Sequence, residues 1–240
     1  MAEWSGGAEA RPLTLAVPKG RVLQQLAPVL EAYGVDTRDV LADDRRLVRR
    51  DPRTGLSFLL LKPDDVPTYV EYGTADAGVV GRDVLLERDY DLYQPLDLGI
   101  GRCRMVVAGF ADRVLPRERT LRVATKFERI ARRHFAASGV PVEIIYVQGS
   151  VEIAPIVGLA DVIVDIVESG ETLRQNGLAV LEHILDISSV VVVNRLSYKL
   201  HEPEVRRLLG ALSGCVTAPP RAGTKAGTKR RRSASTSRSV

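Results

Sequence analysis

The amino-acid sequence predicts an α/β protein in two domains, on three observations. Short apolar runs such as Leu13–Val17 and Leu121–Thr125 recur, and apolar residues repeat at helical spacing between them. Strands that alternate with helices in this way are typical of parallel sheets covered on both faces. Of the 240 residues, 45% are hydrophobic, which is enough for one or two cores. The pattern changes character at a charged linker, residues 113–119, so the chain is expected to cross between two domains and back, leaving a cleft.

We expect domain I to comprise residues 13–108 and 188–212, and domain II to be an insert of residues 109–187. Residues 1–12 are polar and Gly-rich, and are expected to form a disordered N-terminal extension. Residues 213–240 are rich in Ser, Thr, Gly, Pro and basic residues, which predicts a disordered basic tail rather than a regulatory domain.

The net charge of +4 does not predict a nucleic-acid-binding surface. Seven of the 34 Lys and Arg residues lie from Arg221 onward, where there are no acidic residues. The other 27 stand against 30 acidic residues, which gives the body of the chain a net charge of −3. Because a nucleic-acid-binding domain normally presents a basic patch, we expect no nucleic-acid partner.

The sequence also indicates a cytoplasmic protein without a membrane partner. No apolar run approaches the length that spans a bilayer, and Met1–Leu13 is no signal peptide. Cys103 and Cys215 lie far apart without metal-type spacing, as expected of free thiols in a reducing cytosol.

Taken in order, the first predicted strand, Leu13–Val17, leads into a turn that contains Lys19, Gly20 and Arg21. Apolar residues at helical spacing then predict a helix that ends at Gly34. Two cations thus lie at a strand-to-helix turn, where free backbone amides already favour an anion. The turn is a candidate phosphate contact, and a solvated basic turn fits the same pattern.

Two basic residues flank the next predicted strand, Leu56–Leu61. Arg45 precedes it, beyond a turn at residues 51–55, and Lys62 follows it directly. A guanidinium presents a planar fork that binds a phosphate through two hydrogen bonds, whereas an ammonium is a point charge. From sequence alone Arg45 fits a phosphate contact and a salt-bridged surface arginine about equally well, and both interpretations stay open.

The string after Lys62 predicts a turn and a short helix that ends at Gly73. Residues 75–81 predict another buried strand, and Asp83 opens the helix that follows it. The Asp83 carboxylate at this corner contacts a ligand or caps the helix by accepting a backbone N–H, and both interpretations stay open. The elements predicted after the linker are strands at 121–125, 142–147, 160–167 and 188–195, and helices at 126–138 and 202–212.

The residues after the strand at 160–167 form the richest candidate site. Gly170 lacks a Cβ, so the backbone bends sharply and approaches a ligand closely. The hydroxyls of Ser169 and Thr172, with the free amides of the next helix, favour a phosphate. The carboxylates of Asp165 and Glu168 indicate that the ligand also carries ribose hydroxyls or Mg²⁺. A helix cap after a buried strand is the alternative.

The string GSVE-x-AP-x-x-GLAD-x-IVDIV-x-SG-x-TL (149–173) resembles the ATP phosphoribosyltransferases that open histidine biosynthesis. The Lys-Gly-Arg turn (19–21), the DVPTYVEYG string (65–73) and Ala-Thr-Lys (124–126) match the same family in the same order. The resemblance covers residues 13–212. Ordinary type I phosphoribosyltransferases usually carry two adjacent acids before the loop, whereas Asp165 and Glu168 are three apart.

The resemblance implies a periplasmic-binding-protein-like (type II) architecture with an inter-domain cleft. It also implies a Mg²⁺-dependent reaction between ATP and phosphoribosyl pyrophosphate (PRPP), which gives phosphoribosyl-ATP. Metal ligands are not implied for particular residues. Many relatives carry arginine where this chain has Lys62, so a bidentate role there is in doubt. The implied site residues are Asp165, Glu168, Ser169, Gly170, Glu171 and Thr172 for PRPP, Lys19, Gly20, Arg21, Lys62 and Asp83 for ATP and pyrophosphate, and Arg21 and Arg45 as catalytic residues.

The family includes long members with a C-terminal histidine-sensing domain, and this sequence resembles the short form. The resemblance therefore implies a homodimer that joins a regulatory subunit similar to histidyl-tRNA synthetase. A solute-binding module of the same fold, without chemistry, is the alternative.

Overall fold

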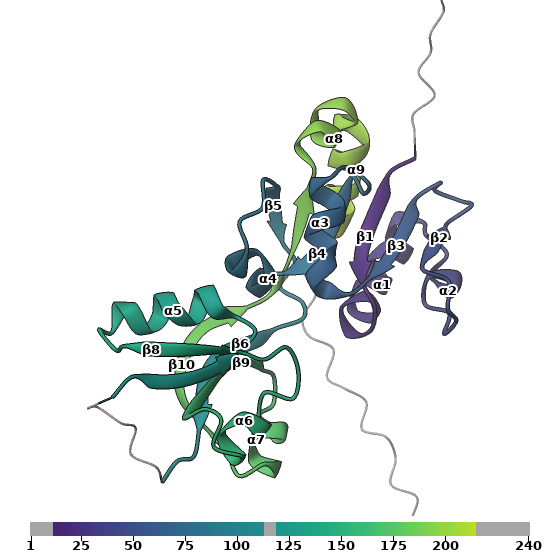
Figure 1. The fold of residues 1–240 in the computed structure, drawn as a ribbon. Coiled ribbons are helices and arrows are strands. Elements are labelled where there is room, and N and C mark those ends of the chain that lie inside the picture. The colour runs from purple at the N-terminus through teal and green to yellow at the C-terminus, as the bar shows by residue number, and fades with distance from the viewer. Residues whose placement is uncertain (1–11, 113–118, 215–240) are drawn as a thin grey trace, which may run out of the picture.

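The computed structural model describes residues 12–112 and 119–214. Within these residues the chain forms two β-sheets, each covered by helices on both faces (Figure 1). The predicted α/β class is thus confirmed. The expected N-terminal extension and basic tail lie, apart from Pro12, Ser213 and Gly214, outside the described residues.

The first sheet has the strand order β2-β3-β1-β4-β11-β5 and is accompanied by six of the helices. The strands are β1 (Thr14–Pro18), β2 (Val48–Arg50), β3 (Ser57–Leu61), β4 (Ala77–Gly81), β5 (Tyr93–Asp97) and β11 (Ser189–Val193). The helices are α1 (Arg21–Tyr33), α2 (Thr37–Val40), α3 (Val66–Glu71), α4 (Arg82–Glu87), α8 (Arg195–Leu200) and α9 (Glu202–Leu212), with a 3₁₀ turn η1 (Pro63–Asp65).

Among the described residues no helix is both long and apolar enough to cross a membrane.

Strand β1 lies inside the first sheet and is parallel to both β3 and β4. Its side chains alternate between two cores, because successive residues of a strand point to opposite faces. Leu15 and Val17 pack with α1 and α9 on one face, and Ala16 packs with α3 on the other. The parallel strands all end at one edge of the sheet, so the turns after β1, β3 and β4 meet there.

The second sheet has the order β10-β6-β9-β7-β8. Ile130 and Phe135 of α5 cover one face, and Ala154 of α6 and Leu173 of α7 cover the other (Figure 1). The strands are β6 (Cys103–Gly109), β7 (Leu121–Thr125), β8 (Val142–Tyr146), β9 (Val162–Val167) and β10 (Ala179–Ile187), and the helices are α5 (Glu128–Ala137), α6 (Ile153–Ile156) and α7 (Glu171–Gln175).

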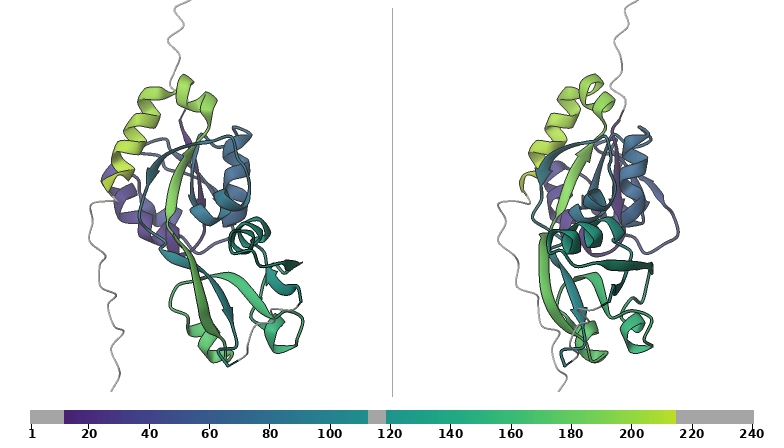
Figure 2. Two further views of the ribbon diagram at one scale, coloured as in Figure 1. Left: turned by 90° about the vertical axis from the view of Figure 1, so that its left-hand side faces the viewer. Right: turned by 60° about the vertical axis from the view of Figure 1, so that its left-hand side comes forward.

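Both sheets are mixed, which corrects the expectation of wholly parallel sheets. β11 runs antiparallel to β4 and β5, and β6 runs antiparallel to β9 and β10. The reason is topological: β6 carries the chain into the second sheet, and β10 with β11 carries it back. Two crossings that lie side by side must run in opposite directions. Figure 2 shows the return path as the light-green segment that runs between the two sheets.

Strand β6 belongs to the second sheet. The expected domain I includes residues 98–108, whereas β6 pairs with β9 and β10, and its Met105 and Val107 share a core with Phe127. The chain therefore leaves the first sheet between Asp97 and Cys103. β10 has no counterpart among the predicted strands, because most of its side chains are exposed and show no alternating apolar pattern.

Candidate functional site

Three residues predicted from separate motifs lie along one edge of the first sheet. β1 and β3 are parallel neighbours and end together, so Lys19 and Lys62, which follow them, are adjacent. The Lys19 amide donates to the Leu61 carbonyl oxygen at 3.2 Å, and both lysine side chains are exposed. Asp83 follows β4, the neighbour of β1 on its other side. The edge therefore presents two cations beside one acid.

The N-terminus of α1 opens onto this edge. Gly20, the residue before the helix, has a φ of 92°, and no side chain within the described ranges caps the first turn. A Cβ at Gly20 would meet no atom within 4 Å, so the space beside its backbone is open to a ligand. Free amides, the positive end of the helix dipole and the Arg21 guanidinium together suit a phosphate group.

The predicted PRPP loop follows β9 at the edge of the second sheet. Gly170 is left-handed, with a φ of 76°, and starts α7. The Ser169 Oγ accepts a hydrogen bond from the Glu171 amide at 3.3 Å. The Glu171 carboxylate is paired with Arg174 along the helix, which leaves Thr172 and Ser169 as exposed hydroxyls of the loop.

Arg21 and Glu168 connect the two motifs across the two sheets. Arg21 Nη1 forms an ion pair with Glu168 Oε1, and the two side chains are 41% and 63% exposed. A pair this exposed contributes little to stability. It matters here because it places the cation of the Lys-Gly-Arg turn directly beside the PRPP loop, with further guanidinium donors left for a ligand.

Lys126 forms a second link between the sheets. Its Nζ lies 3.2 Å from Asp64 Oδ1 of the first sheet. The turn that carries it is fixed by the buried Thr125 hydroxyl, which donates to the Val164 carbonyl at 2.6 Å and accepts from the Phe127 amide at 2.8 Å. Lys126 therefore belongs with the candidate residues from both sheets.

A buried carboxyl group, Asp83, and a half-buried one, Asp165, lie in the field of Lys126. Burial raises the pKa of Asp83, and the Lys126 charge opposes this rise. Burial also raises the pKa of Asp165 to about 6, with a hydrogen bond from the Ile166 amide opposing it and the charge of Glu152 adding to it. A carboxyl that titrates near pH 6 accepts hydrogen bonds from ligand hydroxyls when ionised, as the ribose role requires.

We expect the stability contributed by Asp165 to fall as pH rises from about 4 to about 7. Its pKa is about 6 in the folded protein against an ordinary 3.8, so the folded state holds the extra proton between these values. Ionisation of Asp165 as the pH rises through this range therefore lowers the free energy of unfolding by on the order of 2–3 kcal/mol. The decrease levels off above pH 7. Urea unfolding of the wild type and of Asp165→Asn from pH 4 to 8 gives the difference in unfolding free energy between them. The titration of all other groups is common to both proteins and cancels in this difference. A difference that stays constant with pH contradicts the raised pKa.

A third link joins α4 to α5. The Glu87 carboxylate accepts hydrogen bonds from the amides of Arg129 at 2.9 Å and Ile130 at 3.2 Å, in the first turn of α5. Arg129 also pairs with Asp89 at 2.7 Å. Sequence reasoning missed Glu87, because no residue near it in the chain indicates that it caps α5, a helix that covers the second sheet.

Arg45 lies at the same edge of the first sheet, but within the described ranges it contacts none of the other candidate residues. β2 is antiparallel to β3, so the residues before β2 lie beside the end of β3, and the Leu60 amide donates to the Leu47 carbonyl at 2.8 Å. Neighbouring strands are about 5 Å apart, which puts the Arg45 turn roughly 10 Å from the turn after β1. Its side chain is exposed.

Cys103, expected only as a free thiol, lies at the start of β6 beside the candidate site. Burial and then the Asp83 charge raise the pKa of its thiol to about 11, so it remains protonated and is not a nucleophile. It borders a cavity of about 660 Å³ that Glu168 also lines. A second hollow of about 260 Å³ lies by Tyr33 and Arg207, apart from the candidate residues.

The described residues contain no group of three or more His, Cys, Asp or Glu side chains arranged to bind a metal ion. Asp165 is half-buried, and Glu168 is paired with Arg21. Magnesium in nucleotide sites keeps several waters and binds one or two carboxylates together with substrate phosphates. The donors present thus fit an ion carried by a phosphate ligand rather than one held by protein groups alone.

Known proteins resemble this chain over most of its length. A family model described as HisG, ATP phosphoribosyltransferase, matches residues 62–214. The ATP phosphoribosyltransferase of Sorangium cellulosum is 56% identical over 208 residues, which span 85% of this chain and 98% of the relative. That of Nitrosococcus oceani is 48% identical over 206 residues, 85% and 96% of the two chains.

A solved structure shares the fold. The ATP phosphoribosyl transferase (HisG:HisZ) complex from Thermotoga maritima contains a chain that matches with a TM-score of 0.73 and 39% identity, over 85% of this chain and 98% of that one. The likeness confirms the predicted architecture of two helix-covered sheets.

Proposed function

We infer the activity from one premise: the chain belongs to the ATP phosphoribosyltransferase family. We propose that it transfers the 5-phosphoribosyl group of PRPP to N1 of the adenine of ATP, which yields phosphoribosyl-ATP and pyrophosphate. This is the first step of histidine biosynthesis. The observation that carries the proposal is the Arg21–Glu168 ion pair, because it brings the phosphate-binding turn of one sheet to the PRPP loop of the other.

The reaction breaks the bond between C1 of the ribose and the pyrophosphate oxygen, and forms one from C1 to N1. N1 attacks with its lone pair, so no residue has to remove a proton first. Positive charge builds on the ribose ring and negative charge on pyrophosphate, so catalysis is mainly positioning and electrostatic stabilisation. In this proposal Gly170, Ser169 and Thr172 hold the 5′-phosphate, while Asp165 and Glu168 accept from the ribose hydroxyls.

The cations of the first sheet hold the leaving group. Lys19 and Lys62 lie at adjacent strand ends, and Arg21 opens α1, so their charges converge on one place. We assign pyrophosphate to this place, Arg45 to its outer side, and Asp83 to the ATP contacts. Magnesium carried by the substrate phosphates would neutralise part of their charge.

We also propose that the chain forms a homodimer and works with a separate regulatory subunit in the cytoplasm. The relative from Thermotoga maritima is named as a HisG:HisZ complex, which supports a partner of this kind. Feedback inhibition by histidine would then be a property of the complex rather than of this chain.

A phosphoribosyl-ATP formation assay tests the activity. The purified chain is supplied with ATP, PRPP and Mg²⁺, with and without the regulatory subunit. We expect product in the wild type and more with the partner. Thr172→Ala should lower kcat/KM about 10–30-fold, mainly through KM for PRPP, because one hydrogen bond to a charged phosphate contributes about 1.5–2 kcal/mol.

Thr120→Ala is the matched control, since Thr120 is an exposed threonine beside β7 of the same sheet. It should leave both constants within twofold of wild type. Equal effects of the two substitutions would remove Thr172 from the loop assignment. If PRPP binds but no product forms under either condition, the chain is a binding module of the same fold.

A further inference from the structure

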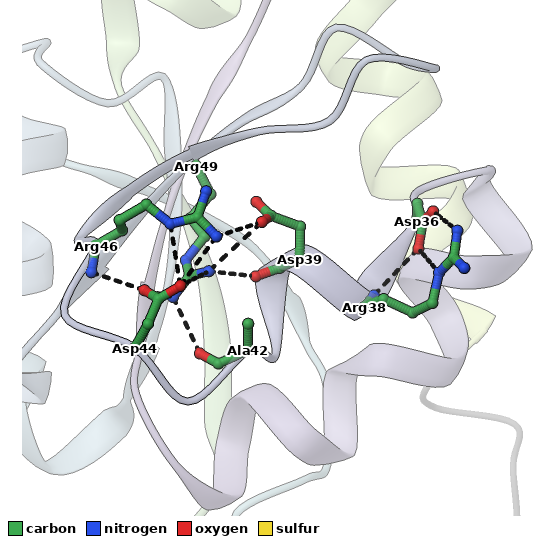
Figure 3. Close-up of polar contacts among 7 residues, drawn as sticks. All are labelled: Asp36, Arg38, Asp39, Ala42, Asp44, Arg46 and Arg49. Carbon is green, nitrogen blue, oxygen red and sulfur yellow. Dashed lines mark hydrogen bonds and ion pairs between the residues drawn. The ribbon is translucent and has the colours of Figure 1, made fainter.

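A buried arginine, Arg49, binds the segment that carries Asp44 and Arg46, the residues on either side of Arg45 (Figure 3 shows Arg49, Asp44 and Arg46). Arg49, the middle residue of β2, has a side chain that is 0% exposed. Its guanidinium donates to the Asp39 carbonyl at 2.5 Å, to the Ala42 carbonyl at 3.0 Å and to Asp44 Oδ1 at 2.7 Å. All three acceptors belong to the single segment that leads from α2 into β2.

Asp44 connects this buried arginine to Arg45. Its Oδ1 also accepts the Arg46 amide at 2.8 Å, which closes an Asx turn with Arg45 as the middle residue. The Arg46 side chain donates to Asp44 Oδ2 at 2.9 and 3.0 Å and to Asp39 Oδ1 at 2.6 Å. The Arg45 side chain is therefore exposed, whereas the residues on either side of it, Asp44 and Arg46, are held by hydrogen bonds.

Stability alone does not explain a charged side chain at this position. The fully buried Arg49 guanidinium loses its hydration, while its partners Asp39 and Asp44 stay 45% and 39% exposed. A well-packed apolar residue in place of a buried charge is often as stable or more so. Arg49 Nε is also buried without a hydrogen-bond acceptor among the described residues. The hydrogen bonds of Arg49 act locally, because they hold the segment from Asp39 to Asp44 in one backbone conformation.

The segment that leads from α2 into β2 ends at the sheet edge where the proposed pyrophosphate site lies. The Leu47 carbonyl accepts a hydrogen bond from the Leu60 amide at 2.8 Å. This bond holds the turn beside the end of β3, the strand that Lys62 follows. We propose that Arg49 is a positioning residue of the transfer reaction, which holds the Asp44–Arg46 turn so that Arg45 faces the departing pyrophosphate. The inference rests on the proposed function, which assigns Arg45 to that leaving group.

A double-mutant cycle on kcat tests this, with Arg49→Lys and Arg45→Ala made singly and together. Lysine keeps the charge of Arg49 but cannot donate to two carbonyls and a carboxylate at once. We expect Arg49→Lys to lower kcat about 10-fold in the wild-type background, with KM for PRPP within twofold. In the Arg45→Ala background the same change should lower kcat less than twofold, because a residue that acts only through Arg45 has nothing left to position.

Arg50→Lys is the matched control, because Arg50 is the next residue of β2 and its side chain is exposed. It should change kcat less than twofold in either background. Equal losses from Arg49→Lys in both backgrounds overturn the proposal, and so does full activity of Arg49→Lys or of Arg45→Ala. If Arg49→Lys does not fold, Asp44→Asn replaces it in the cycle, since it weakens the same turn from the other side.

Hydrogen exchange separates this inference from the activity itself. The Arg46 amide should exchange at least 10-fold faster in Arg49→Lys than in Arg50→Lys, because its acceptor Asp44 is no longer held. An unchanged exchange rate overturns the positioning role whether or not the chain makes phosphoribosyl-ATP. Faster exchange in Arg49→Lys, in a chain whose wild type makes no product, would instead locate the failure in the proposed function.

Discussion

Replacing Arg21 with alanine is expected to lower kcat about 10³-fold. Arg21 is the one cation of the Lys-Gly-Arg turn that pairs with Glu168 of the predicted PRPP loop. In the proposed function it therefore lies where negative charge develops on pyrophosphate. Removing a single donor aimed at developing charge typically lowers the rate by 10²–10³-fold, and this donor also carries a full charge. The loss should fall on kcat more than on KM, because the interaction strengthens as the bond to pyrophosphate breaks.

Two further variants define what Arg21 contributes. Arg21→Lys keeps the charge but loses the planar fork, and should recover about 10-fold of the lost activity. Arg206→Ala is the control, because Arg206 is an exposed helical arginine paired with one carboxylate, Glu202, on α9. It should stay within twofold of wild type. Steady-state kinetics with PRPP varied at saturating ATP measures all three, and an Arg21→Ala enzyme within 10-fold of wild type contradicts the role.

Gly170→Val is expected to lower kcat/KM for PRPP by at least 10²-fold. Gly170 has a φ of 76°, in the left-handed region that a β-branched residue rarely adopts. Valine there strains the first turn of α7 and turns the loop amides away from the 5′-phosphate. It also introduces side-chain atoms where the backbone is proposed to approach the ligand.

Gly177→Val separates the strain from the site. Gly177 follows the same short helix and also has a positive φ, of 71°, and a Cβ added there would meet no atom within 4 Å. Both variants should lose stability by a similar amount, on the order of 1–2 kcal/mol, while only Gly170→Val loses affinity for PRPP. Thermal unfolding and binding of PRPP measure the two effects, and equal affinity losses in both variants would contradict a ligand contact at Gly170.

Local patterns predicted much of what these experiments address. The helix at 202–212 and the strand at 121–125 were predictable to the residue, because apolar spacing and flanking turns decide such elements within a few positions. The sequence also predicted a sharp backbone bend at Gly170, which has a φ of 76°, and the glycine that ends α1. By contrast β2, β5 and β10 carry mostly exposed side chains, so their strand character comes from pairing with neighbours rather than from their own sequence.

The sequence by itself determined the α/β class, the strand-to-helix turns and the candidate phosphate-binding loop, since each depends on residues close together in the chain. Only the tertiary structure decided that the sheets are mixed, that Arg21 pairs with Glu168, and that Arg49 lies under the Arg45 turn. It also decided the raised pKa of Asp165, through burial and through charged residues from segments distant in the chain. Such features depend on which distant segments pack together, and that choice is made by the whole core rather than by any local pattern.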